Sequence, residues 1–265
     1  MHVITRLALG AAFCLIGAAA RAEQGCILDN CADRRASPIE QQDRYQQRGY
    51  GRDSDRRYDQ RRDYGGGQRA RPRGPSTPGD FDFYVFSLSW SSGFCATGGA
   101  EKGKAQCAPG SHLGFVVHGL WPQYERGFPQ DCRGGSPSFI AMRQAEGLFP
   151  DQGLARYEWR KHGTCSGKAP ADYFADVRRA RDSIVVPPQF SQARGDARVS
   201  PAEILRAFES ANPRLRPGMA AVGCQRGVLQ EVRFCMTKDL RDFRPCPEVV
   251  QQSCRAPQVA IPAPL

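Results

Sequence analysis

Apolar and polar positions alternate in recognisable patterns only in the C-terminal two thirds of the chain. Residues 81–90 read FDFYVFSLSW, an aromatic and β-branched run with partial alternation that predicts a strand. Residues 115–118 form a second short apolar run, and residues 228–236 alternate, so each of these segments also predicts a strand. The glycine- and alanine-containing stretch 95–107 predicts a loop between the first two strands.

Two further segments have the spacing of helices. Within residues 171–184 the apolar positions recur at nearly helical intervals. Residues 200–203 read SPAE, a capping box with proline at the first helical position, and predict a helix that runs through Phe208. Strands and helices intermix without βαβ repetition, so the expected fold class is α+β.

The first 22 residues have the order of a secretory signal peptide. Arg6 precedes an apolar stretch over residues 7–20, and Ala20-Arg21-Ala22 supplies an A-x-A end, which predicts cleavage near Ala22. The apolar stretch is too short to cross a bilayer as a helix. A lipoprotein anchor is the alternative, but it requires a small residue before Cys14, where Phe13 stands. We therefore expect a secreted or periplasmic protein without a membrane anchor.

Residues 23–79 lack the apolar side chains that a core requires. From about residue 33 onward the segment is rich in Arg, Gln, Asp, Gly and Tyr, and such a composition cannot offset the entropy of ordering. We predict a disordered spacer here and one folded domain over residues 80–265. The alternative is a segment that holds single-stranded RNA by charge and stacking. The spacer is favoured because the composition is generic.

Cysteine usage and charge narrow the class of protein. The chain has 11 cysteines, and removal of Cys14 with the signal peptide leaves an even number without a C-x-x-C pair. This predicts a disulfide framework formed in an oxidising compartment, whereas a zinc site would need closely spaced Cys and His pairs. Cys26 and Cys31 are candidates to close a small loop together. The net charge of +10 favours a polyanionic partner without requiring one.

Residues 158–165 (EWRKHGTC) contain the first group of candidate catalytic residues. If residues 157–162 are helical, Glu158, Lys161 and His162 lie on one face at i, i+3 and i+4, and Gly163 ends the helix. A carboxylate, an ammonium and an imidazole on one patch suit phosphoryl transfer. The alternative is a surface helix with an ordinary ion pair, and this segment alone does not decide between them.

Residues 118–122 (HGLWP) contain the second group of candidate catalytic residues. His118 follows an apolar run and precedes a glycine, which predicts the end of a strand that enters a turn. Trp121 would then offer an indole to a base, the alternative being a core tryptophan beside a structural histidine. Two histidines in separate segments suit cleavage of RNA by 2′-hydroxyl attack. One imidazole takes the hydroxyl proton, the other protonates the leaving 5′-oxygen, and a cation balances charge on the phosphorane.

The two segments, in this order, resemble the active-site segments of the ribonuclease T2 family. Residues 83–95 and 229–235 are also similar to an opening strand and a late strand of that family, so the resemblance covers about residues 80–256. It implies an endoribonuclease with a central antiparallel sheet flanked by helices. It further implies a single-stranded RNA substrate, 2′,3′-cyclic phosphate products, and neither metal nor cofactor. A monomer is expected.

The resemblance also implies a role for each site residue. His162 would act as general base and His118 as general acid, while Glu158 and Lys161 would stabilise the phosphorane. Trp121 would stack on the base 5′ to the cut. Four disulfides are implied in the same way: Cys95–Cys107, Cys132–Cys165, Cys224–Cys254 and Cys235–Cys246.

Two positions depart from the family pattern. Tyr157 stands where some members have a phosphate-binding histidine, and Gln123 stands where fungal members carry an acid that helps to read the base. Neither change removes a proton-transfer residue. A catalytically silent RNA-binding protein on the same scaffold is the alternative function, and it is disfavoured because every proton-transfer position is intact. A metal-dependent phosphodiesterase is disfavoured because no H-E-x-x-H or P-loop motif is present. His112 is expected to be a solvated loop residue.

Overall fold

The computed structural model describes residues 76–102, 104–130 and 132–265. The predictions for the signal peptide, for spacer residues 23–75 and for a bridge between Cys26 and Cys31 lie outside these ranges. Residues 76–79, the first that the structure describes, are hydrogen-bonded to the rest of the domain. The Ser76 amide donates to the Gln130 carbonyl at 3.2 Å, and the Gly79 amide donates to the Cys165 carbonyl at 3.0 Å. Within the described ranges, every helix is too short or too polar to cross a bilayer.

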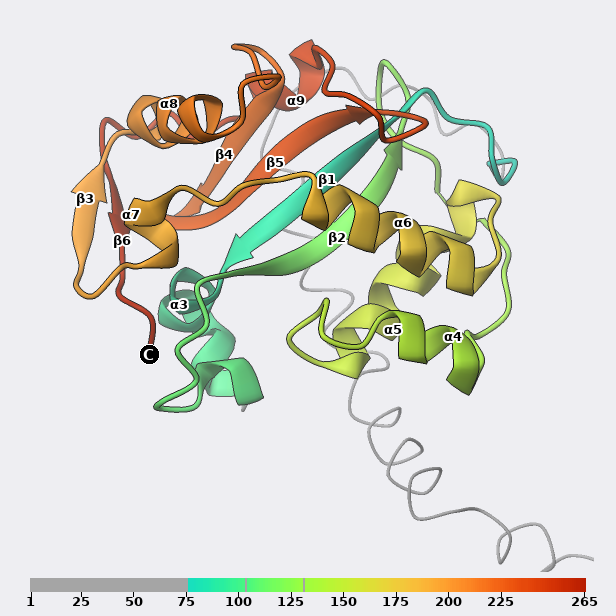
Figure 1. Cartoon of the computed structure of the whole chain (residues 1–265), viewed down its shortest axis with the longest axis horizontal. Coiled ribbons are helices and arrows are strands. Elements are labelled where there is room, and N and C mark those ends of the chain that lie inside the picture. Colours follow the sequence, from blue (N-terminus) through green and yellow to red (C-terminus); the bar gives the residue numbers. More distant parts are fainter. Residues whose placement is uncertain (1–75, 103, 131) are drawn as a thin grey trace, which may run out of the picture. The chain divides into compact units, whose positions relative to one another are not determined.

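A six-stranded sheet forms the centre of the domain (Figure 1). Its strand order is β2-β1-β5-β6-β3, and β4 pairs with β5. The strands are β1 (Phe83–Trp90), β2 (Phe115–Gln123), β3 (Ala197–Val199), β4 (Ala220–Gln225), β5 (Val228–Thr237) and β6 (Val259–Ile261). All pairs are antiparallel except β5 and β6, which meet in parallel at Val228 and Ala260. The α+β prediction is confirmed, and the sheet is mixed because the short β6 joins it in parallel.

Two of the longer helices cover one face of this sheet. In Figure 1, α6 (Pro170–Asp182) crosses β1 and β2, and α8 (Pro201–Ala211) packs on β4. The strand side chains that point toward these helices form the main core, with Tyr84, Phe86, Leu88, Val232 and Phe234 among its buried members. The remaining helices are α3 (Ser91–Phe94), α4 (Phe139–Gln144), α5 (Gln152–Lys161), α7 (Pro188–Ser191) and α9 (Pro247–Gln251).

The sequence signals for the helices and the long strands act as predicted. The capping box of α8 forms, because the Ser200 hydroxyl accepts from the Glu203 amide at 3.2 Å while the Glu203 carboxylate accepts from the Ser200 amide at 2.7 Å. Its two hydrogen bonds satisfy donors that the first helical turn leaves unpaired. The helical segment over residues 171–184 is α6, and the alternating segment over residues 228–236 is β5.

Two local predictions are wrong. Strand β2 does not end at His118 but continues to Gln123. Pro122 is tolerated within it because β2 is an edge strand, where one row of amides needs no partner strand. The stretch 95–107, expected to be a plain loop, contains short helical turns at Cys95–Gly99, Ala100–Lys102 and Ala105–Cys107.

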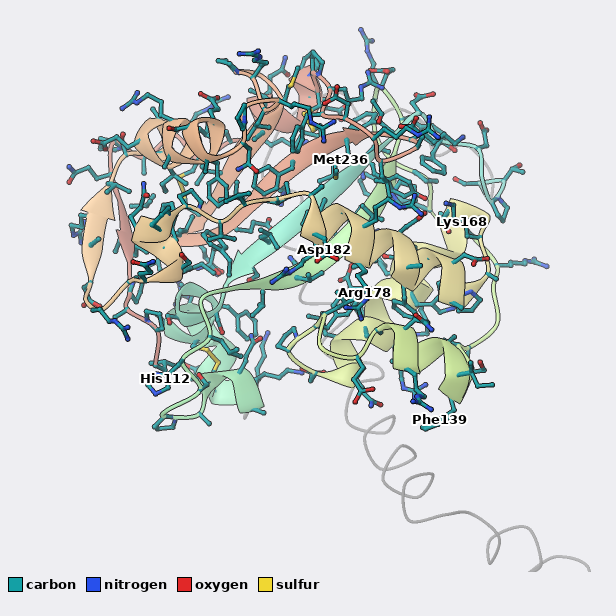
Figure 2. The ribbon with its side chains drawn as sticks, in the orientation of Figure 1. His112, Phe139, Lys168, Arg178, Asp182 and Met236 are labelled. Atoms are coloured by element: carbon teal, nitrogen blue, oxygen red, sulfur yellow. A yellow bond between two sulfur atoms is a disulfide. The ribbon has the colours of Figure 1, made fainter. Side chains whose placement is uncertain are left out.

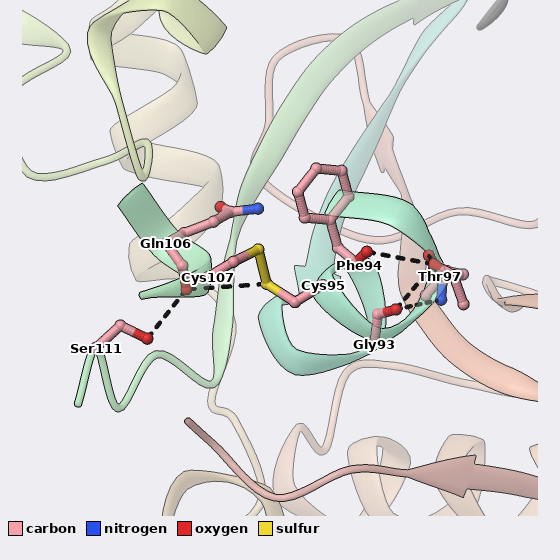
Figure 3. Close-up of a disulfide and its surroundings, with 8 residues drawn as sticks. Gly93, Phe94, Cys95, Thr97, Gln106, Cys107 and Ser111 are labelled. Carbon is pink, nitrogen blue, oxygen red and sulfur yellow. Dashed lines mark hydrogen bonds between the residues drawn. A yellow bond between two sulfur atoms is a disulfide. The ribbon is translucent and has the colours of Figure 1, made fainter. Parts of the chain in front are cut away.

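All four disulfides implied by the resemblance are present: Cys95–Cys107, Cys132–Cys165, Cys224–Cys254 and Cys235–Cys246. Figure 3 shows the first, which closes the turns after α3, with Thr97 Oγ1 donating to the Gly93 carbonyl at 2.9 Å. The Cys132–Cys165 bridge matters most for the site, because Cys165 lies in the turn directly after α5. Four such bridges are typical of proteins that fold in an oxidising compartment.

Candidate active site

His118 occupies a β-bulge in β2. Gly119 pairs with Ser87 and Val117 pairs with Leu88, so His118 is the extra residue between the two pairs. A bulge disrupts the alternation of a strand and redirects the side chain at that position. The redirected imidazole is 14% exposed, and its Nδ1 lies 3.0 Å from Oε2 of Glu231 on β5. The sequence predicted a special backbone position for this histidine but assigned it to a strand end.

Helix α5 brings Glu158 to the same imidazole. The helix begins at an Asp151 cap, whose carboxylate accepts from the Leu154 amide at 2.8 Å. Two turns later Glu158 is buried, with 1% of its surface exposed. Its Oε1 lies 3.9 Å from Nε2 of His118, and its Oε2 accepts the indole hydrogen of Trp121 at 2.7 Å. The Glu158 side chain of the predicted helical face therefore points at β2.

His162 completes the group at the C-terminal end of α5. Its backbone leaves the helical conformation, with φ −128° and ψ −44°, while its amide still donates to the Glu158 carbonyl at 2.9 Å. The centroid of its ring lies 5.4 Å from that of Trp121, and the centroid of the His118 ring lies 5.1 Å from the same indole. A single tryptophan thus contacts both imidazoles, although they come from distant parts of the sequence.

Glycine at position 119 makes this packing possible. A Cβ atom there would lie 2.1 Å from Oε2 of Glu158 and 2.3 Å from Nε1 of Trp121. Both atoms belong to the hydrogen bond that joins α5 to β2. The residue after His118 is therefore glycine because the Glu158 carboxylate occupies the space that a side chain would need.

The other predicted residues lie beside this group or away from it. Lys161 is the last residue of α5, partly exposed and one helical turn after Glu158; its role at the site stays a prediction. His112 is exposed on the loop before β2, as expected, and its amide donates to the Leu265 carbonyl at 2.7 Å (Figure 2). Among the residues that the structure describes, no group of three or more His, Cys, Asp or Glu side chains is arranged to hold a metal ion.

Residues 81–246 match the ribonuclease T2 family. The chain belongs to this family. A ribonuclease from Aeromonas hydrophila is 35% identical over 188 residues, which cover 68% of this chain and 84% of that protein. Ribonuclease DdI from Dictyostelium discoideum is 28% identical over 202 residues, which cover 68% and 84% of the two chains. The family assignment indicates an endoribonuclease, and RNA is the substrate class that it supports.

Solved structures show that the fold is shared as well. A mutant of RNase MC1 in complex with 5′-UMP superimposes with a TM-score of 0.54 at 23% identity, over 68% of this chain and 97% of that one. Trichomaglin, described as a novel S-like ribonuclease, gives a TM-score of 0.52 at 24% identity, over 70% of this chain and all of the other. At these identities the likeness establishes the fold alone.

Sequence reasoning missed three residues that surround His118 in this ribonuclease. Ser87 Oγ donates to Oε2 of Glu231 at 2.7 Å, and Nε of Arg233 donates to Oε1 of the same carboxylate at 2.9 Å. The Arg233 guanidinium also lies 5.6 Å from the Trp121 ring. A signal was present in the sequence, because an acid and a base two positions apart in an otherwise apolar strand share one face of a sheet. These three residues lie on the sheet face opposite α6 and α8, because along β1 and β5 they alternate with Leu88 and Val232 of the main core.

The charge of Glu231 follows from these contacts. Burial alone would raise the pKa of this carboxyl, because a low-dielectric environment disfavours the charged form. The Arg233 guanidinium, the hydrogen bond and charge of His118, and the Ser87 hydroxyl outweigh burial. Together they hold the pKa of Glu231 well below its usual range. The site thus contains a fixed carboxylate beside one of its two imidazoles.

Proposed function

We propose that this ribonuclease cleaves single-stranded RNA by attack of a ribose 2′-oxygen on the adjacent phosphorus. The products would be a 2′,3′-cyclic phosphate and a free 5′-hydroxyl. The observation that carries the proposal is the contact of one indole, that of Trp121, with both His118 and His162, beside the buried Glu158 carboxylate. Two imidazoles with a charged partner suit a reaction that removes one proton and supplies another.

The proton transfers follow from the roles of the two rings. His162, neutral at the start, takes the proton of the 2′-hydroxyl while the 2′-oxygen forms its bond to phosphorus. His118, protonated at the start, gives its proton to the 5′-oxygen as the P–O5′ bond breaks. The step leaves His162 protonated and His118 neutral, so a second step with water in the reverse sense would open the cyclic phosphate and restore both rings.

Glu158 and Lys161 are proposed to stabilise the phosphorane. The ammonium of Lys161 would offset its negative charge, and the Glu158 carboxylate would orient the His118 imidazole toward the reacting phosphate. For Trp121, stacking on the base stays a prediction, because the structure buries all but 4% of this residue. Because it is 4% exposed and bonded to Glu158, we propose that it also positions the carboxylate. No metal takes part in this scheme.

One assay separates this proposal from its alternatives. The purified protein is incubated with a ribo-oligonucleotide and with its 2′-deoxy counterpart, each with and without EDTA, and the products are identified by mass spectrometry. We expect cyclic phosphate ends from the ribo-substrate only, with or without EDTA. Binding without products would support a catalytically silent RNA-binding protein. Cleavage of the deoxy substrate, or loss of cleavage in EDTA, would support a metal-dependent phosphodiesterase.

We also infer that the protein is exported and acts in the periplasm or outside the cell as a monomer. The disulfides support an oxidising compartment. Export by residues 1–22 predicts a mature N-terminus near Glu23, which mass spectrometry of the fractionated protein would test. The spacer prediction implies that deletion of residues 33–75, which leaves the hydrogen-bonded residues 76–79 in place, does not change cleavage or its salt dependence. A deletion that weakens RNA binding at low salt would instead support the RNA-holding alternative.

A further inference from the structure

We infer that Glu231 is a positioning residue for His118. Its carboxylate would hold the Nδ1 side of the imidazole, direct Nε2 toward the scissile phosphate and keep the ring protonated until the leaving group requires the proton. The inference rests on the proposed function, in which His118 is the general acid.

Both oxygens of the Glu231 carboxylate have hydrogen-bond partners. Oε2 accepts from Ser87 at 2.7 Å and lies 3.0 Å from Nδ1 of His118, whereas Oε1 accepts from Arg233 at 2.9 Å. The side chain is also packed from the β4 side, because a Cβ atom at Gly223 would lie 2.7 Å from its Cγ. A carboxylate fixed at both oxygens and along its stem has one orientation. It can therefore fix the orientation of the ring that it contacts.

This contact decides which nitrogen of His118 is available for chemistry. Nδ1 must carry a hydrogen to bond an ionised carboxylate, so Nε2 is the nitrogen that exchanges a proton with substrate. Nε2 lies on the side of Glu158, 3.9 Å from its Oε1, and thus faces the rest of the site. In metal sites and catalytic triads a carboxylate often orients a histidine by accepting the hydrogen of the ring nitrogen that is not used in the chemistry.

The surrounding charges favour the protonated ring. Glu231 contacts His118 from β5, and Glu158 faces it from α5. Arg233, also on β5, lies over the Trp121 ring, and His162 contacts the same indole. Arg233 is paired with Glu231, and its positive charge helps to keep that carboxyl ionised. An anion in direct contact with Nδ1 stabilises the imidazolium, which is the form that a general acid requires.

The test is the pH dependence of kcat/KM for Glu231→Gln and Glu231→Asp, measured on the full mature protein with a dinucleotide substrate. The general acid sets the basic limb of the profile and the general base sets the acidic limb. Without the anion, the basic limb should move to lower pH by about one unit, and the rate above neutrality should fall roughly tenfold. The acidic limb should stay in place. Glu231→Asp retains the charge, so its basic limb should lie closer to that of the wild type.

Two controls make the result specific. Glu146→Gln, an equivalent change at an exposed position after α4, should leave both limbs unchanged. If Glu231→Gln does not fold, Arg233→Gln supplies the second arm, because loss of a nearby cation should leave the basic limb in place or raise it. A downward shift in Arg233→Gln would overturn the inference. A Glu231→Gln profile that matches the wild type, or falls by one factor at every pH, would also overturn it.

The proposed function fails separately. If His118→Ala cleaves at the wild-type rate, His118 is not the general acid, and Glu231 has no general acid to position. His118→Ala that is inactive, together with an unshifted Glu231→Gln profile, would leave the proposed function intact and reject only the positioning role.

Discussion

The indole hydrogen of Trp121 bonds the carboxylate of Glu158 at 2.7 Å and so joins strand β2 to helix α5 beside the two histidines that contact this indole. Trp121→Phe should retain the ring and lose this bond. A buried acceptor without its partner costs about 1–3 kcal/mol, so the melting temperature should fall. kcat should fall by roughly tenfold or more, because the carboxylate is no longer held beside the imidazoles.

The matched control for this variant is Trp159→Phe. Trp159 is also buried, and its indole donates to the Gly135 carbonyl at 2.7 Å, but it belongs to the main core. We expect a similar loss of melting temperature with a much smaller loss of kcat. Equal losses of kcat in the two variants would mean that Trp121 acts through stability alone.

Gly119→Ala should be more severe than its size suggests. The added methyl group would overlap the Glu158 carboxylate and the Trp121 indole, so α5 must move away from β2 or the carboxylate must rotate. We expect a loss of activity on the order of 100-fold, measured as kcat/KM, since misplacement by about 1 Å has effects of that size. Gly195→Ala is the control, because a Cβ atom there meets nothing within 4 Å. Retention of full activity in Gly119→Ala would contradict the close approach.

The Cys132–Cys165 bridge should support activity as well as stability. It closes 33 residues and fixes the turn that follows His162. Loop entropy assigns such a bridge about 3–4 kcal/mol. The double Ser variant should therefore melt at lower temperature and lose activity below its melting transition. The Cys95–Cys107 double Ser variant should lose stability but keep the activity of its folded form, because that loop lies after α3.

Stability should depend on pH through Glu231. The pKa of this carboxyl is lowered in the folded protein, so the ionised group stabilises the fold above the unfolded value near 4.5. This contribution is lost as the pH falls through the folded pKa. The melting temperatures of the wild type and Glu231→Gln should therefore differ most above pH 4.5 and converge below it. A difference that stays constant down to strongly acidic pH would contradict the lowered pKa.

Local signals in the sequence were sufficient for strands β1 and β5 and for the capped helix α8, whereas the approach of Glu158 and His162 to Trp121 was expected from the resemblance of the two motifs to the family. They failed where pairing partners decide the structure. The bulge at His118 arises where the register between β1 and β2 shifts, and the sequence of β2 alone does not determine that register. Glu231 and Arg233 could not be assigned to the site for the same reason. Strand β5 pairs with β1, which is distant in the sequence, as well as with its sequence neighbour β4.

The short elements were beyond sequence reasoning for another reason. Strands β3 and β6 have three residues each, too few for an alternating pattern to stand out. They form because the C-terminal segment returns to the sheet next to β5. Long-range pairing, not local propensity, sets such strands.

The central claim is that two imidazoles share one phosphodiester, and pH–rate profiles of single histidine variants test it most directly. The measurement is kcat/KM on a ribodinucleotide for the wild type, His118→Ala and His162→Ala, with cyclic phosphate quantified as product. We expect a bell-shaped wild-type profile, loss of the acidic limb in His162→Ala, loss of the basic limb in His118→Ala, and rates lowered by roughly 100- to 10,000-fold in each. A variant that keeps the wild-type rate and both limbs would contradict the claim.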